Sequence, residues 1–258
     1  MTQPPIWLLI DGTHHVYRDF YAAGDRDASL LRARIPLLFD HFKPARIVAA
    51  FDCGPSFRSR LFPAYKGERS KPEEIDAAID AAKAAYIDEE IDLIEAPDFE
   101  ADDILATLSR LGRSLGNRIV IASADKDLHQ LILEGEVLQA VRLLRDRDQL
   151  SPGYVNANDL QVQYFVTPEQ WVDYRCLIGD KSDNIDGVRG IGKETAGRIL
   201  SQIGSLDAFY ANPFKVAGIK PGIHAKLINA KPRIPLLRQL LTLRDDVPLP
   251  EGWSDVAT

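Results

Sequence analysis

Three short apolar runs constrain the fold of this chain more than any other feature. They cover residues 6–10, 47–51 and 118–122, and an aspartate follows each within three residues. Runs of this length are typical of strands buried on both faces of a parallel sheet. Segments with helical periodicity separate them, at residues 28–41, 72–89 and 101–115. The alternation predicts an α/β fold in which helices flank a parallel sheet.

The second part of the chain has a different character. From about residue 156, short helical segments punctuated by Pro and Gly replace the alternation of strands and helices. We therefore expect a core domain over residues 1–155 and a helical region over 156–258. A length of 258 residues with 45% hydrophobic and 27% charged residues is sufficient for a globular core with such an appendage.

The sequence also indicates where the protein acts. No stretch of it approaches the length of a membrane span, and the longest apolar run near the N-terminus covers only residues 6–10. The two cysteines, Cys53 and Cys176, form no CxxC pair, as expected of small apolar residues in a reducing compartment. We expect a cytoplasmic protein that does not contact membranes.

Acidic residues recur at the predicted ends of strands and helices. Ligands of open α/β sheets bind beyond the carboxyl ends of the strands, so Asp11, Asp52 and Asp125 are expected to converge on one crevice. Other carboxylates follow at the start of a predicted helix, after the third apolar run and late in the chain. The full set is Asp11, Asp52, Glu100, Asp102, Asp103, Asp125, Asp127, Asp180 and Asp183.

A group of carboxylates in one crevice is stable mainly when cations neutralise it. Hard oxygen ligands without His or Cys favour Mg²⁺, which Mn²⁺ can replace. Two such ions about 4 Å apart can clamp the attacking and leaving oxygens of a phosphodiester displacement. The alternative is that each Asp after a strand caps a turn or a helix. His14 and His15 are treated as ordinary polar residues, because neighbours on a helix cannot both point inward.

Six motifs in order resemble the five-prime nuclease and flap endonuclease family, and the chain is similar to the exonuclease domain of bacterial DNA polymerase I. The motifs are Ile10-Asp11-Gly12, Phe51-Asp52, Phe57-Arg58 with Tyr65-Lys66-Gly67-Glu68-Arg69, Glu100-Ala101-Asp102-Asp103, Ser123-Ala124-Asp125-Lys126-Asp127-Leu128 and Gly179-Asp180-Lys181-Ser182-Asp183-Asn184-Ile185. The resemblance implies a PIN-like α/β core and a stand-alone member of the family.

The resemblance also implies a role for each carboxylate. Asp11, Asp52, Glu100 and Asp102 would hold a first Mg²⁺ ion, whereas Asp125, Asp127 and Asp183 would hold a second. Asp103 and Asp180 would support these ligands from outside. Asp186 and Ala124 depart from the family pattern, but neither departure removes a ligand.

A glycine-rich stretch in the second half predicts a helix-hairpin-helix. Gly190, Gly192 and Lys193 lie in the run Gly187-Val188-Arg189-Gly190-Ile191-Gly192-Lys193, which an apolar-periodic helix follows. Glycines allow close approach to phosphate, and a helix N-terminus adds partial positive charge. In the family such a hairpin, often with a bound monovalent cation such as K⁺, grips DNA phosphates without reading sequence. The alternative is a tight turn in a core.

Basic residues interleaved with aromatic ones follow Asp52. Arg58, Tyr65, Lys66 and Arg69 belong to this segment, which suits a channel that tracks a single strand by charge and stacking. Lys66 and Arg69 are expected at the scissile and adjacent phosphates, where cations stabilise transition-state charge. Arg18 matches a basic position that relatives keep near the DNA end. The alternatives are a solvated loop and a surface arginine.

These features predict a five-prime to three-prime exonuclease and flap endonuclease that acts on DNA with five-prime ends, flaps or junctions. RNA primers on DNA are a second expected substrate, and a monomer is expected. A net charge of −7 does not exclude DNA if nine carboxylates bind metal, which leaves +2 on the rest of the chain. The alternatives are a non-catalytic DNA-junction-binding protein on the same fold and a PIN-like ribonuclease.

Overall fold

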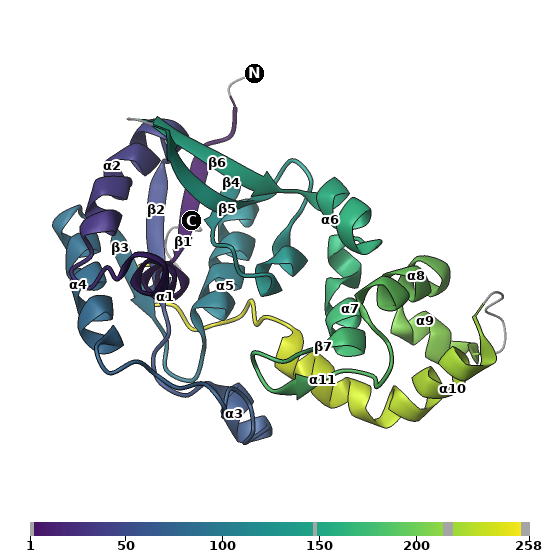
Figure 1. Ribbon diagram of the computed structural model, residues 1–258. Helices are drawn as coiled ribbons and strands as arrows, with labels where there is room; N and C mark the ends of the chain where they lie inside the picture. The colour runs from purple at the N-terminus through teal and green to yellow at the C-terminus, as the bar shows by residue number, and fades with distance from the viewer. Residues whose placement is uncertain (1–2, 147–148, 214–218, 254–258) are drawn as a thin grey trace. The chain divides into compact units, whose positions relative to one another are not determined.

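The computed structural model describes residues 3–146, 149–213 and 219–253, without the side chains of residues 141–151. The chain forms two compact units (Figure 1). The first contains residues 1–56, 70–156 and 243–258, and the second contains residues 57–69 and 157–242. One junction lies at the expected border near residue 156. The units are nevertheless discontinuous, because residues 57–69 belong to the second unit and the C-terminal segment belongs to the first.

A six-stranded sheet forms the centre of the first unit, with the strand order β3-β2-β1-β4-β5-β6. The strands are β1 (Ile6–Asp11), β2 (Arg46–Phe51), β3 (Asp92–Glu95), β4 (Arg118–Ala122), β5 (Val137–Asp146) and β6 (Gln149–Val155). The three apolar runs form β1, β2 and β4, as expected. Parallel pairing joins all neighbours except β5 and β6, which pair antiparallel. The sheet is therefore mostly rather than wholly parallel.

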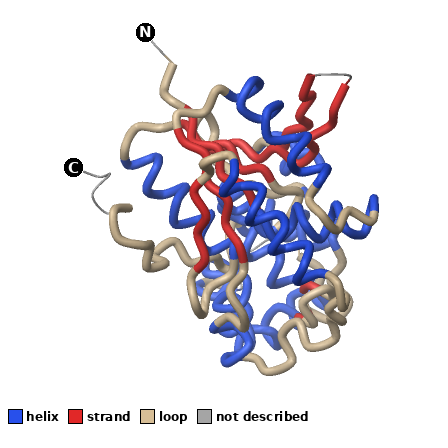
Figure 2. The backbone as a smooth tube through the Cα atoms, turned by 90° about the vertical axis from the view of Figure 1, so that its left-hand side faces the viewer, coloured by secondary structure: helices blue, strands red, loops and turns tan. Residues whose placement is uncertain are grey.

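Helices cover both faces of this sheet (Figure 2). They are α1 (Gly12–Ala23), α2 (Ser29–Phe42), α4 (Ile75–Asp88) and α5 (Ala101–Ser114), followed by the short η1 (Asp127–Leu131). Successive strand residues point to opposite faces, so Leu8 and Ile10 pack with α1, α2 and α4. Trp7 and Leu9 pack against α5 on the other face. The expected parallel core flanked by helices is confirmed.

The start of α1 is tied closely to the sheet. Asp11 ends β1 and caps α1, because its side chain accepts a hydrogen bond from the backbone N–H of His14. A Cβ atom on Gly12 would come within 2.5 Å of the Phe51 ring, so only glycine allows the helix to begin this close to β2. The chain therefore turns from strand to helix directly at the carboxyl end of β1.

The C-terminal segment crosses the face of the first unit that α5 covers. The backbone N–H of Val247 donates to the hydroxyl of Thr107 at 3.1 Å. Trp253 packs edge-on against Trp7, and the guanidinium of Arg46 lies 3.7 Å from the Trp253 ring centroid. These contacts make residues 243–253 part of the hydrophobic core between the sheet and α5.

The second unit is mainly helical, as expected for this half of the chain. Its elements are α3 (Phe57–Leu61), α6 (Ala157–Tyr164), η2 (Pro168–Gln170), α7 (Trp171–Ile178), β7 (Gly179–Asp180), β8 (Ile185–Asp186), α8 (Lys193–Ile203), α9 (Leu206–Ala211), α10 (Pro221–Ala230), η4 (Lys231–Arg233) and α11 (Ile234–Leu241). Trp171, Tyr174 and Phe209 are buried at its centre. Among the described residues, no helix is both long and apolar enough to cross a membrane.

Candidate functional site

Asp11 lies at the central position of the candidate site, at the end of the strand between β2 and β4. Its Oδ1 accepts the backbone N–H of His14 at 2.9 Å, and its Oδ2 accepts the hydroxyl of Ser123 at 2.8 Å. The side chain is buried. Burial raises the pKa of Asp11 to about 7, and the charges of Asp125 and Asp52 add to the increase. This pKa reflects a carboxylate that lacks a neutralising partner.

Asp52 connects the end of β2 to the start of α5. Its Oδ1 accepts the backbone N–H of Ala101 at 2.7 Å, and its own backbone N–H donates to the hydroxyl of Thr13 at 2.9 Å. Glu100 caps the same helix and accepts a hydrogen bond from the hydroxyl of Ser56 at 3.2 Å. The N-terminus of α5 thus orients both carboxylates, which the helix dipole also favours.

Asp102 lies in the first turn of α5, and no described residue donates a hydrogen bond to its carboxylate. Burial raises the pKa of Asp102 well above its ordinary value. Four other carboxylates raise it further, those of Asp125, Asp11, Asp127 and Asp52. We call these five residues the acidic cluster. Their mutual repulsion shows that their side chains are close together in the first unit.

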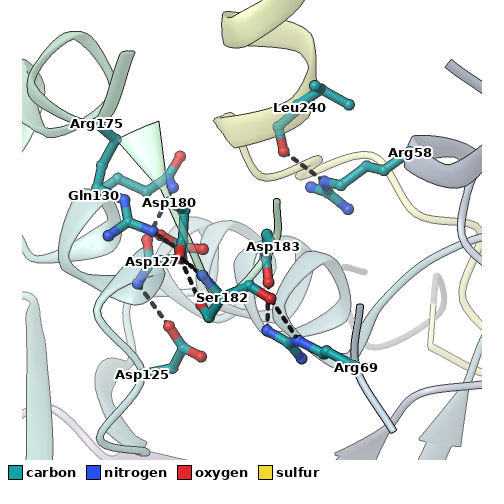
Figure 3. Close-up of polar contacts among 10 residues, drawn as sticks. All are labelled: Arg58, Arg69, Asp125, Asp127, Gln130, Arg175, Asp180, Ser182, Asp183 and Leu240. Atoms are coloured by element: carbon teal, nitrogen blue, oxygen red, sulfur yellow. Dashed lines mark hydrogen bonds and ion pairs between the residues drawn. The ribbon is translucent and has the colours of Figure 1, made fainter. Parts of the chain in front are cut away.

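Asp125 and Asp127 follow β4 and lie in a tight turn (Figure 3). Oδ1 of Asp125 accepts the backbone N–H of Asp127 at 2.8 Å. The backbone N–H of Asp125 donates to the hydroxyl of Ser123 at 3.0 Å. Ser123 therefore bridges Asp125 to Asp11, a role that the sequence analysis did not assign to it. Its position in the sequence, between the end of a predicted strand and Asp125, could have indicated this role.

The donor set of the acidic cluster fits divalent cations that prefer oxygen. All of its side chains are carboxylates, and one of them receives no hydrogen bond from the described residues. Hard cations such as Mg²⁺ and Mn²⁺ are held by such oxygen ligands. A bound cation would also remove the repulsion that raises the pKa values of Asp11 and Asp102.

Asp103 lies next to the cluster but is oriented away from it by two backbone groups. Its Oδ2 accepts the N–H of Glu100 at 3.1 Å, and its Oδ1 accepts the N–H of Arg244 at 2.8 Å. The residue is fully buried. Asp103 therefore caps α5 and attaches the C-terminal segment to it, which is the capping role considered as the alternative.

The two late aspartates belong to the second unit: Asp180 ends β7, and Asp183 lies on the loop between β7 and β8. Arg175 and the hydroxyl of Ser182 donate to Asp180 (Figure 3). Burial alone would raise the pKa of Asp180, but these hydrogen bonds and the charge of Arg175 lower it below its ordinary value. Asp183 is buried and accepts a hydrogen bond from the guanidinium of Arg69.

The same loop positions two predicted cationic residues. Arg69 Nε donates to the carbonyl of Ser182 at 3.0 Å (Figure 3), and the backbone N–H of Lys66 donates to the carbonyl of Asp183 at 3.1 Å. Asn184 Nδ2 donates to the carbonyl of Ala64 at 3.0 Å. The basic segment therefore packs along the loop that carries Ser182 and Asp183.

Arg58 and Tyr65 differ from the expectation of accessible DNA-binding side chains. Arg58 is 1% exposed, and its guanidinium donates to the carbonyls of Leu240 at 2.8 Å and Thr242 at 3.1 Å. Tyr65 is also buried. These carbonyls lie at the end of α11, where a helix leaves acceptors unpaired. Arg58 therefore binds the backbone of the second unit.

The remaining predicted contacts lie on separate elements. Arg18 lies on α1 and pairs with Asp19. Gly190 has a φ of 75° and lies in the turn before α8, where the N–H of Ile191 donates to the carbonyl of Val188 at 2.9 Å. Gly192 caps α8, and Lys193 is its first residue. Gly190, Gly192 and Lys193 are all exposed.

Two family models together match most of the chain. The "5'-3' exonuclease, N-terminal resolvase-like domain" matches residues 6–159, and the "5'-3' exonuclease, C-terminal SAM fold" matches residues 166–258. Thermostable DNA polymerase I from Thermus thermophilus is 35% identical over 94% of this chain, which corresponds to 29% of the polymerase. The chain thus spans less than a third of the length of this relative.

Two solved structures from bacteriophage T5 share the fold. The T5 5'-exonuclease with bound zinc has a TM-score of 0.73 and 22% identity, covering 92% of this chain and 88% of that one. The T5 flap endonuclease in a complex with DNA and metal ions has a TM-score of 0.72 and 23% identity, covering 93% and 89% respectively. At this identity the likeness shows the fold alone. By its two family-model matches, the chain belongs to the 5'-3' exonuclease family.

Proposed function

We propose that the protein is a divalent-metal-dependent five-prime to three-prime exonuclease and structure-specific flap endonuclease that hydrolyses DNA phosphodiesters. The observation that carries this proposal is the acidic cluster, in which burial and the neighbouring carboxylates raise the pKa values of Asp11 and Asp102. Such a cluster is unfavourable unless cations occupy it. It lies at the carboxyl ends of β1, β2 and β4, where α/β folds bind ligands.

The proposed ligands divide between two Mg²⁺ ions. Asp11, Asp52, Glu100 and Asp102 would hold the first. Asp125 and Asp127 would hold the second, with Asp183 from the second unit as a further ligand. Asp180 and Asp103 would support their neighbours by hydrogen bonding. When bound, the ions would stabilise the charge that develops on the attacking and leaving oxygens of the phosphodiester. No side chain is required as a nucleophile.

Cationic side chains would bind the DNA. We assign Lys66 and Arg69 to the scissile and adjacent phosphates, because their segment packs along the loop of Asp183. The turn with Gly190, Gly192 and Lys193 would contact duplex phosphates as a helix-hairpin-helix. Its backbone carbonyls would be the ligands of a bound K⁺ ion. Arg18 would contact a phosphate near the DNA end.

The proposed partners are DNA with five-prime ends, flaps or junctions, and RNA primers annealed to DNA. The T5 flap endonuclease, which shares this fold, is known in a complex with DNA and metal ions. We further propose that the protein acts as a monomer in the cytoplasm. Cys53 and Cys176 are both free thiols, which supports a reducing compartment.

Cleavage of a five-prime flap labelled separately at each end tests this proposal. Mg²⁺ should allow cutting near the junction, and EDTA should abolish it. Asp125→Asn should reduce the rate by at least about 100-fold, in the range expected when an electrostatic contribution to catalysis is lost. Asp80→Asn removes an exposed carboxylate from α4 and serves as the matched control with unchanged cleavage.

Other results would favour the alternatives. Tight flap binding without cutting under both Mg²⁺ and Mn²⁺ would indicate a DNA-junction-binding protein. Preference for single-stranded RNA in a competition with flap DNA would indicate a PIN-like ribonuclease.

A further inference from the structure

Two arginines share one buried carboxylate between α1 and α2. Asp19 is 8% exposed. Its Oδ1 accepts hydrogen bonds from Arg18 Nε at 3.1 Å and Nη2 at 3.0 Å. Arg34 donates from Nη1 to Oδ2 at 2.9 Å and from Nη2 to Oδ1 at 3.1 Å. We call these three residues the arginine pair site. Two guanidinium groups on one carboxylate leave a surplus of one positive charge.

Arg18 is the more accessible of the two cations. Its side chain is 30% exposed, whereas that of Arg34 is 13% exposed. No described residue accepts a hydrogen bond from Arg18 Nη1. Asp19 therefore fixes the plane of the Arg18 guanidinium while one of its nitrogens stays available to an anion. A guanidinium held in this way loses little conformational freedom when it binds phosphate.

The arginine pair site lies beside the acidic cluster on the same unit. His14, one helical turn before Arg18 on α1, interacts electrostatically with Asp125, Arg18 and Asp19. Its Nε2 atom is buried and has no hydrogen-bond partner among the described residues. Arg18 thus lies about two helical turns along α1 from Asp11, the cluster residue that caps this helix.

We propose that Asp19 is a positioning residue that holds Arg18 in place to bind a phosphate group of DNA next to the acidic cluster. Arg34 keeps the site positively charged despite the buried carboxylate. This inference rests on the proposed function for the identity of the ligand. A five-prime terminal phosphate and an internal phosphodiester share the required chemistry.

Asp19→Asn has two opposing consequences for DNA affinity, so the direction of the change in Kd tests the proposal. The substitution makes the protein more positive by one charge, so simple electrostatics predicts tighter DNA binding. Loss of the ion pair that orients Arg18 predicts weaker binding instead. We expect Kd to rise by about 10-fold, which corresponds to the loss of one charged hydrogen bond to phosphate.

The measurement is the fluorescence anisotropy of a duplex with a five-prime single-stranded extension, labelled at its three-prime end. Ca²⁺ replaces Mg²⁺ so that the full chain binds without cutting, and a failure of catalysis would leave this measurement intact. Asp40→Asn makes the same charge change at an exposed position on α2 and should leave Kd unchanged or slightly lower. Asp19→Glu keeps the charge and should restore part of the affinity.

A double-mutant cycle separates positioning from loss of fold. In an Arg18→Met background there is no guanidinium to orient, so Asp19→Asn should no longer weaken binding. Tighter binding by Asp19→Asn alone, or the same loss of affinity in both backgrounds, would overturn the proposal. A comparison of DNA that ends in a five-prime phosphate with DNA that ends in a five-prime hydroxyl identifies the ligand. If Asp19→Asn weakens binding only when the terminal phosphate is present, Arg18 binds that group. If it weakens binding of both DNAs, Arg18 binds an internal phosphate.

Discussion

Replacing Asp11 by asparagine should stabilise the metal-free protein at high pH. Burial and the neighbouring carboxylates raise the pKa of Asp11 from 3.8 to about 7 in the folded state. A folded-state pKa above the unfolded one means that stability is fully present below about pH 4 and is lost as the pH rises through 7. At 1.36 kcal/mol per pKa unit, ionised Asp11 lowers the free energy of unfolding by about 4 kcal/mol.

Asparagine removes this titration and can still cap α1 through its amide oxygen. Its amide nitrogen cannot accept the hydrogen bond from the Ser123 hydroxyl, and this loss opposes the gain by about 1 kcal/mol. In EDTA at pH 8 the net stabilisation should be roughly 3 kcal/mol, equivalent to about 6–12 °C in Tm for a chain of this size. Calorimetry between pH 4 and 8 measures the difference between the two proteins, which should grow as the pH rises. Added Mg²⁺ should raise the Tm of the natural protein more than that of the variant.

The exposed control Asp80→Asn should show no such dependence on pH or Mg²⁺. A variant of Asp11 that is no more stable than the natural protein at pH 8 in EDTA would refute the reasoning. A difference that stays constant with pH would do the same, because it would show that Asp11 does not titrate in this range.

Three further predictions concern residues outside the acidic cluster. Asp103→Ala should lower the free energy of unfolding by about 2–4 kcal/mol, because the buried N–H of Glu100 and the partly buried N–H of Arg244 lose their acceptor. Urea denaturation measures this change. Arg58→Met should destabilise the second unit by a similar amount, about 2–4 kcal/mol, because the buried carbonyl of Leu240 and the partly buried carbonyl of Thr242 lose this donor. Limited proteolysis should then cut residues 157–242 faster. Burial raises the pKa of the Cys176 thiol to about 12, so at pH 8 a thiol reagent should label the half-buried Cys53 and leave Cys176 unmodified until the protein unfolds.

Much of the fold was predictable because its central strands are uninterrupted apolar runs. β1, β2 and β4 are buried on both faces, so their sequences are nearly continuous apolar runs without the helical spacing of polar residues that would suggest a surface helix. The other strands gave no such signal. β3 has only four residues and two of them are exposed, and β5 mixes apolar residues with Gln139, Arg142 and Arg145 at irregular spacing. A short or polar edge strand is defined by its neighbours in the sheet rather than by its own composition.

The candidate site was predictable at the level of residue type but not of orientation. A basic residue in a loop-like segment is consistent with both a DNA contact and a buried cap, and Arg58 takes the second arrangement because the end of α11 offers carbonyl acceptors. The pairing of Asp19 with Arg34 joins residues 15 positions apart on two helices. Neither contact follows from local sequence, since each depends on the packing of elements that are distant along the chain.

A carboxylate can cap a helix and bind a metal ion at the same time, because it has more acceptor positions than a cap uses. A carboxylate has about four lone-pair positions. Asp11 accepts hydrogen bonds from the N–H of His14 and the hydroxyl of Ser123, and Asp52 accepts one from the N-terminus of α5. Each carboxylate is therefore oriented by the backbone and still has lone pairs for a cation. Asp103 uses both oxygens to hold two backbone segments together inside the core. The same cap that fixes a helix can therefore aim a ligand, provided that the carboxylate borders the crevice rather than the core.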